Sequence, residues 1–361
     1  MKRRLAALAC ALASPGALGQ SAVVYGLVDV AVEHVTHVGA SGGGLNRMAS
    51  ATGSLPSRIG FRASEDLGDG LSAVVVIEQG FAPNAGTFTQ GGRAFGRQSY
   101  VGFVAPWGSL AVGRQYTMLY WSILDADILG TNIYGSGSLD AYIPNARADN
   151  AITYRGTFSG LTVGATFSLG RDSVSAGSPA GTNCPGEGSD ARECREWSAL
   201  LKYDSPAWGA ALAVDQIRGG PGAFANLTSS ALQDRRLSVN GYVNVANLRL
   251  AVGLVRRDND ASAVAPRSDL WYLGALYAAT PTLKIDAEAF RLAFKGSANR
   301  ATLFAGRATY SLSKRTALYA TLGHIDNAGA LALSVSAGAP GSNPLPGTGQ
   351  IGLATGLRHS F

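Results

Sequence analysis

The sequence predicts an all-β protein: a 16-stranded antiparallel transmembrane β-barrel with short periplasmic turns and long extracellular loops. Three observations predict it: segments that alternate apolar and polar residues, connections that alternate between short and long, and an unusual composition. The 361 residues include 47 Gly and 15% charged residues, whereas soluble domains average about 7% Gly and about 25% charged residues. Beyond the N-terminus no apolar run reaches the roughly 20 residues of a membrane-spanning helix, which excludes a helical membrane protein.

The N-terminus has the pattern of a secretory signal peptide. Residues 2–4 are basic, residues 5–13 are apolar, and residues 17–19 form a small-x-small cleavage site. A short buried helix is the alternative, but it does not account for these flanks. The sequence therefore predicts a signal peptide at 1–19 and a single barrel domain at 20–361.

The exported chain carries little net charge. Removal of the signal peptide takes away three basic residues and leaves 27 basic and 24 acidic residues, a net charge of +3. This excess is too small to predict nucleic acid as a partner.

Two cysteines remain after export, Cys184 and Cys194, in a segment rich in Gly, Ser, Glu and Arg. Export places them in an oxidising compartment, where an even pair at short separation predicts a disulfide across one loop. Two free thiols are the alternative.

The rest of the chain alternates apolar and polar residues. In 248–254 the even positions are large and apolar, and in 283–289 the charges occupy one parity. Because strand side chains alternate between faces, each segment has one apolar and one polar face. A soluble sandwich would alternate in the same way, but the segments have about 9–12 residues, which matches tilted strands that cross a membrane.

The connections between these segments alternate strictly between short and long. Seven short connections lie at 66–70, 105–108, 159–160, 205–209, 246–247, 280–282 and 312–314. Eight long connections lie near 36–51, 82–94, 117–148, 172–194, 219–233, 258–267, 295–300 and 327–349. Together they join sixteen strands and leave both termini on the short-turn side, which is typical of bacterial outer-membrane barrels. We therefore expect the cell outer membrane as location and its lipid as a partner.

The last segment, 351–361, alternates in the same way and ends in Phe361. An aromatic residue at the end of such a strand is expected at the membrane interface. This ending also resembles the C-terminal signal that the barrel-assembly machinery reads, so that machinery is a predicted partner.

Five blocks of characteristic sequence follow one another along the chain. They are Val-Tyr-Gly-Leu-Val-Asp at 24–29, a strand and turn at 57–68, Phe-Gly-Arg-Gln-Ser-Tyr-Val-Gly at 95–102, Gly-Arg-Gln-Tyr at 113–116 and Gly-Leu-Arg-His-Ser-Phe at 356–361. Together they resemble the general porins of Gram-negative bacteria, especially the β-proteobacterial type. The resemblance implies a homotrimer, passive diffusion of small solutes and a third loop folded into the lumen. The Pro-Glu-Phe-Gly-like turn found in that loop of many porins is absent here, from 118–130.

Arginines on inward faces are the candidates for the basic side of a pore constriction. Arg58 and Arg62 have the parity opposite to their apolar neighbours, and Arg155 the parity opposite to the adjacent tyrosine. Arg97 has the parity opposite to Tyr100, which we place outward. The resemblance places arginines of these strands on one side of the constriction. The predicted basic side is Arg58, Arg62, Arg97, Arg147 and Arg155. The alternative for each is an arginine that lines the lumen elsewhere, paired with a carboxylate of the wall.

The predicted acidic side lies in the long third loop and comprises Asp125, Asp127 and Asp140. Opposed charges would act across the narrowing on a partly dehydrated solute. An excess of arginine, which stays charged in any environment, would favour anions. The alternative is that these aspartates belong to ordinary solvated turns. We hypothesise a general diffusion porin for ions and small hydrophilic solutes that prefers anions.

No residue pattern predicts a cofactor, a metal site or an enzyme. His34 and His37 are spaced like metal ligands, but no Cys or carboxylate cluster completes a site, so we expect a pair at the barrel rim. The alternatives to a general porin are a solute-specific channel of the same fold and a non-conducting adhesin or structural barrel.

Overall fold

Antiparallel strands account for most of the chain. The computed structural model describes residues 20–49, 53–172, 183–186, 188–223, 226–262, 266–336 and 341–361, so the predicted signal peptide lies outside the described residues. Eighteen strands form one sheet, and all of them except the short β2 (Gly43–Met48) and β5 (Thr87–Phe88) make the barrel wall. These sixteen are β1 (Ser21–Val38), β3 (Arg58–Gly68), β4 (Leu71–Ala82), β6 (Gln98–Ala105), β7 (Gly108–Tyr116), β8 (Arg147–Phe158), β9 (Leu161–Ser168), β10 (Glu196–Asp204), β11 (Trp208–Arg218), β12 (Gln233–Val245), β13 (Leu248–Asn259), β14 (Arg267–Ala278), β15 (Leu283–Phe294), β16 (Arg300–Ser311), β17 (Thr316–Ala328) and β18 (Gln350–Ser360).

No helix in the described part of the chain is long and apolar enough to span a membrane.

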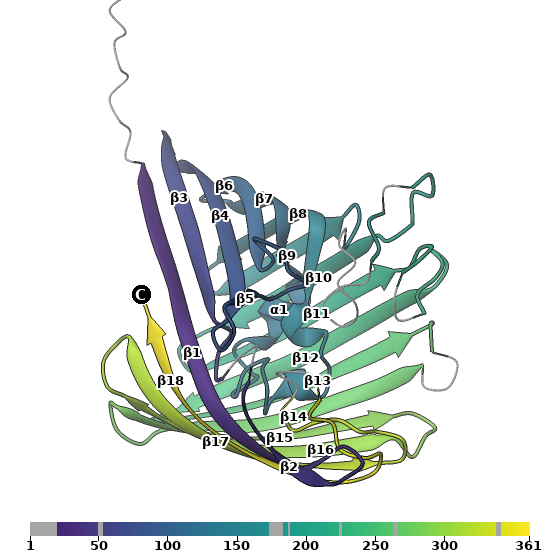
Figure 1. Cartoon of the computed structure of the whole chain (residues 1–361). Helices are drawn as coiled ribbons and strands as arrows, with labels where there is room; N and C mark the ends of the chain where they lie inside the picture. The colour runs from purple at the N-terminus through teal and green to yellow at the C-terminus, as the bar shows by residue number, and fades with distance from the viewer. Residues whose placement is uncertain are drawn as a thin grey trace, which may run out of the picture.

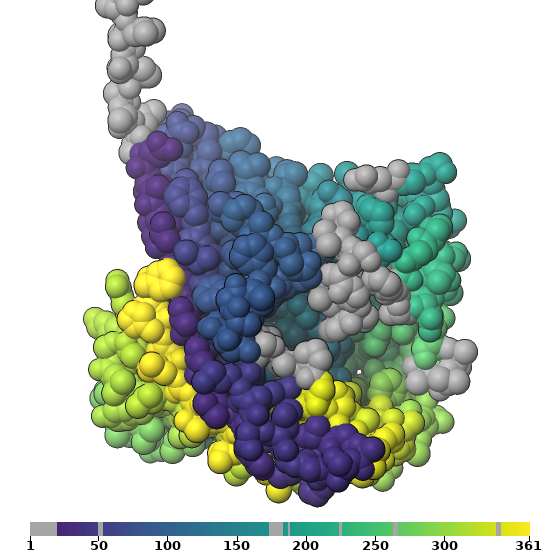
Figure 2. Space-filling model, in the orientation of Figure 1, coloured from purple at the N-terminus to yellow at the C-terminus, as the bar shows by residue number. Residues whose placement is uncertain are grey.

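The sheet closes on itself because β1 is paired along both edges. β1 pairs antiparallel with β3, ending at Leu27 opposite Arg58, and with β18, where Leu27 is opposite Ser360. Figure 1 shows β1 beside β18, and in Figure 2 the purple N-terminal strand lies between the yellow C-terminal strand and the blue strands. Closure leaves no wall strand with an unpaired edge. The predicted 16-stranded antiparallel barrel is therefore confirmed.

The seven short connections are tight turns at the predicted places. Ser159 and Gly160 between β8 and β9 have φ values of 49° and 88°. Two consecutive positive φ values are what a type I′ hairpin turn requires, because its twist matches that of the flanking strands. The eight long connections lie at the opposite end of the barrel, as predicted.

Side chains sort between the two faces of the wall as the alternation predicts. In β13, Leu250 and Val252 are exposed, whereas Ala251 between them is buried. In β18, Leu353 and Leu357 are exposed as well. Large apolar side chains on the outer surface suit a wall that faces lipid. The low charge of the chain follows, because this outer belt carries almost none.

The connection between β7 and β8, residues 117–146, contacts the far wall of the barrel. It contains α1 (Met118–Ile123), η1 (Ser136–Ser138) and η2 (Ile143–Asn145), and α1, labelled in Figure 1, contacts β10, β11 and β12. The Met118 backbone N–H donates to Ser198 Oγ of β10 at 2.9 Å, and the Leu129 N–H donates to Glu288 Oε2 of β15 at 2.8 Å. We call this segment the third loop.

Phe361 lies at the seam where the first and last strands meet. Its backbone N–H donates to the carbonyl oxygen of Gly26 at 3.0 Å, and its own carbonyl oxygen accepts from the Gly26 N–H at 3.1 Å. The Phe361 side chain is exposed. Recognition of this residue by the assembly machinery stays a prediction.

Candidate pore constriction

A cavity of about 240 Å³ lies between the third loop and the wall that runs from β3 to β8. Four arginines and one carboxylate line this constriction cavity: Arg58, Arg97, Arg147, Arg307 and Asp127. Three of the five predicted arginines and one of the three predicted aspartates are thus brought together. They meet because Arg58 and Arg147 begin their strands and Arg97 immediately precedes β6, all at the long-loop end of the wall.

Glu78 and Tyr116 hold Arg97 in the constriction cavity. Arg97 Nε donates to Glu78 Oε1 at 2.6 Å, and Arg97 Nη2 donates to Tyr116 Oη at 2.6 Å. Arg97 is only 4% exposed, and a buried guanidinium is stable only with such partners. Arg58 Nε lies 3.5 Å from Glu78 Oε2, so one carboxylate faces two arginines.

Arg147 is positioned by groups other than carboxylates. Its Nη2 donates to Tyr116 Oη at 2.5 Å and its Nη1 donates to the Pro144 carbonyl oxygen at 3.1 Å. Its guanidinium carbon lies 4.2 Å from the centre of the Tyr116 ring, a cation–π contact. No carboxylate pairs with Arg147 among the described residues. Its guanidinium is therefore fixed in place without a carboxylate counter-charge.

The prediction that Tyr100 faces outward is wrong. Tyr100 lines a second cavity on the inner side of the wall together with Arg62, whereas Val101 and Phe103 are the exposed residues of β6. Arg97 precedes β6, so strand alternation does not decide its direction. Its backbone N–H instead donates to the Glu78 carbonyl oxygen at 3.1 Å.

Arg62 and Arg155 lie at another level of the lumen. Arg62 is four residues beyond Arg58 along β3, about 13 Å closer to the short turns at about 3.3 Å per residue. Arg62 and Arg155 line a cavity of about 160 Å³ with Tyr100 and Trp121, which we call the lower cavity. The Arg155 guanidinium carbon lies 3.9 Å from the centre of the Trp121 ring.

Asp127 is the predicted aspartate that lines the constriction cavity. Ser136 Oγ donates to Asp127 Oδ2 at 2.6 Å. The Asp127 side chain also lies close to the Glu288 carboxyl of β15, whose Oε2 accepts from the Leu129 N–H. Burial raises the pKa of Asp127 to about 6, although the hydrogen bond from Ser136 and the charge of Arg307 act to lower it. Asp127 is therefore mostly ionised at pH 7 and loses its charge as the pH falls through about 6.

Asp125 and Asp140 are not among the residues that line the constriction cavity. Asp125 pairs with Lys202 of β10. Asp140 Oδ2 accepts from Arg236 Nε of β12 at 2.8 Å. Burial opposes ionisation of Asp140, but Arg236 and Arg257 hold its pKa below the usual value. Both aspartates attach the third loop to the far wall.

Three residues of the site were missed from the sequence: Glu78, Tyr116 and Arg307. Glu78 has the parity of the buried Val74 and Val76, so a lone charge on an inward face was the available signal. Tyr116 ends the Gly-Arg-Gln-Tyr block at 113–116, whose resemblance to porins does not by itself indicate a role for the tyrosine. Arg307 had no local signal, because its position depends on β16 pairing with β15, where Arg307 is opposite Asp286.

The family of this barrel follows from its similarity to known proteins. The Gram-negative porin family matches residues 5–330 of the chain. The chain belongs to the Gram-negative porins. This porin is 26% identical to outer membrane porin protein 32 of Delftia acidovorans, with all of both chains covered. It is 29% identical to an outer membrane porin protein of Bordetella pertussis over 63% of this chain and 56% of that protein.

The solved structures agree on the fold. The anion-selective porin from Comamonas acidovorans matches with a TM-score of 0.75 and 22% identity, covering 95% of this chain and 100% of that one. OmpT of Vibrio cholerae, solved in a trimer form, matches with a TM-score of 0.64 and 13% identity over 95% of this chain and 99% of that one. The protein is thus an outer-membrane porin, as the sequence predicts, and its family and relatives are channels.

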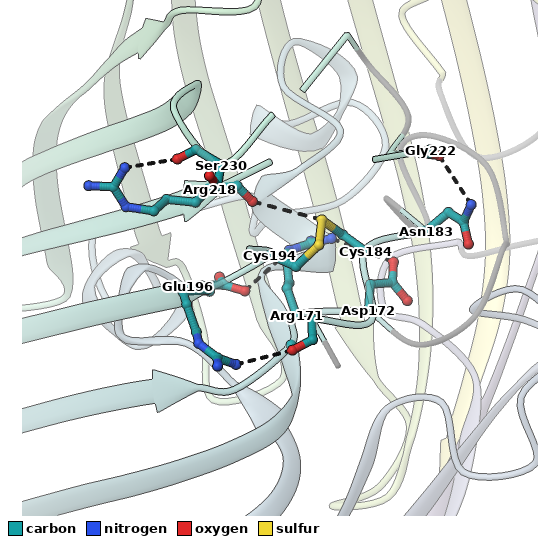
Figure 3. The surroundings of a disulfide bond; sticks show 12 residues. Arg171, Asp172, Asn183, Cys184, Cys194, Glu196, Arg218, Gly222 and Ser230 are labelled. Atoms are coloured by element: carbon teal, nitrogen blue, oxygen red, sulfur yellow. Dashed lines mark hydrogen bonds and ion pairs between the residues drawn. A yellow bond between two sulfur atoms is a disulfide. The ribbon is translucent and has the colours of Figure 1, made fainter. Parts of the chain in front are cut away.

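Cys184 and Cys194 of the porin are joined by a disulfide with a sulfur–sulfur distance of 2.03 Å (Figure 3). The Cys184 backbone N–H donates to the Asp172 carbonyl oxygen at 2.8 Å. Next to it, Arg171 Nε lies 3.2 Å from Glu196 Oε2. The disulfide therefore attaches its loop to the start of β10, away from the constriction cavity.

The N-terminal histidines of the porin make local hydrogen bonds. His34 Nδ1 lies 2.8 Å from Asn46 Oδ1, and His37 Nδ1 lies 3.1 Å from Thr36 Oγ1. Across the ranges that the structure describes, no three His, Cys, Asp or Glu side chains are arranged to hold a metal ion.

Proposed function

We propose that this porin is a general diffusion channel with a preference for anions. Ions and small hydrophilic solutes would move down their gradients through a water-filled lumen, without cofactor, energy input or catalysis. The observation that carries the proposal is the constriction cavity with Arg58, Arg97, Arg147 and Arg307 facing Asp127. A sixteen-stranded barrel encloses a lumen wide enough for water, and the third loop narrows it at this level.

The charge balance of the cavity supports anion preference. Arg58 and Arg97 share the single carboxylate of Glu78, and Arg307 pairs with Asp286. Arg147 adds a charge without a carboxylate partner in the described chain, and Asp127 is the one carboxylate that lines the cavity opposite four arginines. The net local charge is therefore positive, which favours a partly dehydrated anion over a cation. The structurally similar porin from Comamonas acidovorans is itself described as anion-selective.

The reversal potential across a planar bilayer in a potassium chloride gradient tests the proposal. We expect a reversal potential whose sign shows that chloride is more permeant than potassium. A potential of the opposite sign would contradict anion preference, and the absence of conductance would favour the plugged adhesin or structural barrel. A solute-specific channel of the same fold would instead give currents that a sugar or phosphate blocks at saturation.

The proposal includes a homotrimer in the outer-membrane lipid. The chain would reach it after removal of residues 1–19 and insertion by the barrel-assembly machinery, which would read the end at Phe361. One structural relative was solved in a trimer form. Unheated protein on a denaturing gel should run as a trimer and heated protein as a monomer. A monomer band in both lanes would exclude a stable trimer.

A further inference from the structure

The lower cavity contains positive charge that the wall does not neutralise. Neither Arg62 nor Arg155 has a hydrogen bond or ion pair from its side chain to a carboxylate in the described chain, whereas Arg58 and Arg97 share Glu78. Arg62 is exposed and Arg155 is half-buried. Both guanidinium groups lie within electrostatic range of the Tyr100 phenol, so they converge on one volume.

The same cavity offers flat and apolar surfaces to whatever the arginines bind. The Arg155 guanidinium carbon lies 3.9 Å from the centre of the Trp121 ring of α1, a cation–π contact that holds the guanidinium beside this ring. Val74 and Val76 of β4 are buried on the inner face of the wall and line the cavity beside Tyr100. A ligand held here can place its charged end on the arginines and its apolar body against the valines and Tyr100.

Size limits the ligand further. The cavity has about 160 Å³, which corresponds to roughly five water molecules at about 30 Å³ each. A single planar ring with one carboxylate fits this volume. A carboxylate also matches the planar fork of arginine, which can bind both of its oxygens.

We propose that the lower cavity is a binding subsite for aromatic monocarboxylates on the short-turn side of the constriction. The inference deepens the proposed function and rests on it, because the ligand must enter through a conducting lumen. An anion that passes Arg58 and Arg97 reaches Arg62 about 13 Å further on. The subsite therefore retains aromatic carboxylates briefly before their release at the periplasmic end.

Block of the chloride current by benzoate tests the subsite in planar bilayers. Benzoate should reduce the current to a saturating level, and it should act at lower concentration from the periplasmic side. Acetate and inorganic phosphate should block at concentrations at least about tenfold higher, because they lack the apolar ring; tenfold corresponds to about 1.4 kcal/mol. Equal block by acetate would overturn the aromatic part of the proposal.

Three variants locate the subsite. Arg155→Gln and Arg62→Gln should each raise the half-blocking benzoate concentration by about tenfold, because each removes a charge-assisted hydrogen bond. Arg155→Lys should have a smaller effect, since it keeps the charge and loses the planar fork. Arg291→Gln is the matched control, because Arg291 is an exposed arginine outside both cavities.

The outcomes separate the inference from the proposed function. Conductance with anion preference but an unchanged block in Arg155→Gln and Arg62→Gln overturns the subsite and leaves the diffusion channel standing. Absence of conductance in the wild type overturns the proposed function itself. If one glutamine variant fails to form heat-modifiable barrels, the other glutamine variant and Arg155→Lys still decide the question.

Discussion

Arg147 is the constriction arginine whose charge the described residues leave without a carboxylate partner. Tyr116 Oη and the Pro144 carbonyl oxygen orient it, but neither carries a full negative charge. Arg58 and Arg97, by contrast, divide the charge of Glu78 between them. At the scale of single residues, the proposed anion preference therefore depends on which arginines are paired rather than on how many line the cavity.

Replacement of Arg147 by Gln should lower the anion preference most among the constriction arginines. A unit charge changes the energy of an ion about 6 Å away by about 0.7 kcal/mol in water, with opposite signs for an anion and a cation, so the anion-to-cation permeability ratio changes about tenfold. The reversal potential in a salt gradient measures this ratio. Arg291→Gln is again the control and should leave the potential unchanged. A Gln variant with wild-type selectivity would contradict the role assigned to Arg147.

The titration of the Asp127 carboxyl predicts how the ion selectivity of the channel depends on pH. Its pKa is raised to about 6, so the carboxyl is ionised above pH 6 and neutral below it. Its partners at this point are Glu288, Ser136 and Arg307. Because protonation removes a negative charge from the cavity, anion preference should increase as the pH falls from 7 to 5. Asp127→Asn should show the selectivity of acidic pH over the whole range from pH 7 to 5. If selectivity in that variant still changed with pH as much as in the wild type, another group would be responsible.

At the scale of elements, the seven short turns could be predicted because their signals are local. Ser159 with Gly160, or Asp69 with Gly70, occupy left-handed conformations that these residue types supply, and alternating strands flank them. The route of the third loop could not be predicted in the same way. Its partners Ser198 and Glu288 lie 80 and 159 residues away from the atoms that they bind.

The candidate site shows the same division. Arg58 and Arg155 could be assigned inward faces because regular strands carry them. Arg97 lies before its strand, so the parity argument failed even though the residue reaches the cavity. The roles of Glu78 and Tyr116 follow from contacts with Arg97 across strands, which no local pattern contains.

The hydrogen bond that attaches the third loop to Glu288 leads to a prediction about fluctuations of the single-channel current. Glu288→Ala removes the acceptor of the Leu129 N–H, and an unsatisfied buried donor costs about 1–3 kcal/mol. The loop should then leave the wall more often, giving larger current fluctuations in single-channel records. Asn240→Ala is the control, since Asn240 donates to Ser238 of its own strand. Current fluctuations of wild-type size in Glu288→Ala would show that the other contacts are enough to hold the third loop against the wall.

At the scale of the whole molecule, the barrel depends on one seam. Gly26 lies where the start of β1 meets the end of the chain, and a Cβ there would overlap the Arg58 carbonyl oxygen and approach the Phe361 ring to 2.6 Å. Backbone atoms cannot move aside without breaking the pairing of β1 with β3. The seam therefore requires glycine at this position.

Replacement of Gly26 by Ala should destabilise the folded barrel by about 1–3 kcal/mol, the range for overpacked sites. Gly306→Ala is the matched control, because its Cβ would meet nothing closer than the Asp286 carbonyl oxygen at 3.5 Å. The temperature at which the folded gel band converts to the unfolded one measures the difference. Equal conversion temperatures for the two variants would contradict the steric argument.

The pairing of Leu27 with Ser360 also has a consequence for biosynthesis. The first strand to be translated finds one of its two neighbours only when the last residues of the chain have been made. Contacts so distant in sequence form slowly, since the intervening chain must first be ordered. Co-translational folding of the closed barrel is excluded by its connectivity.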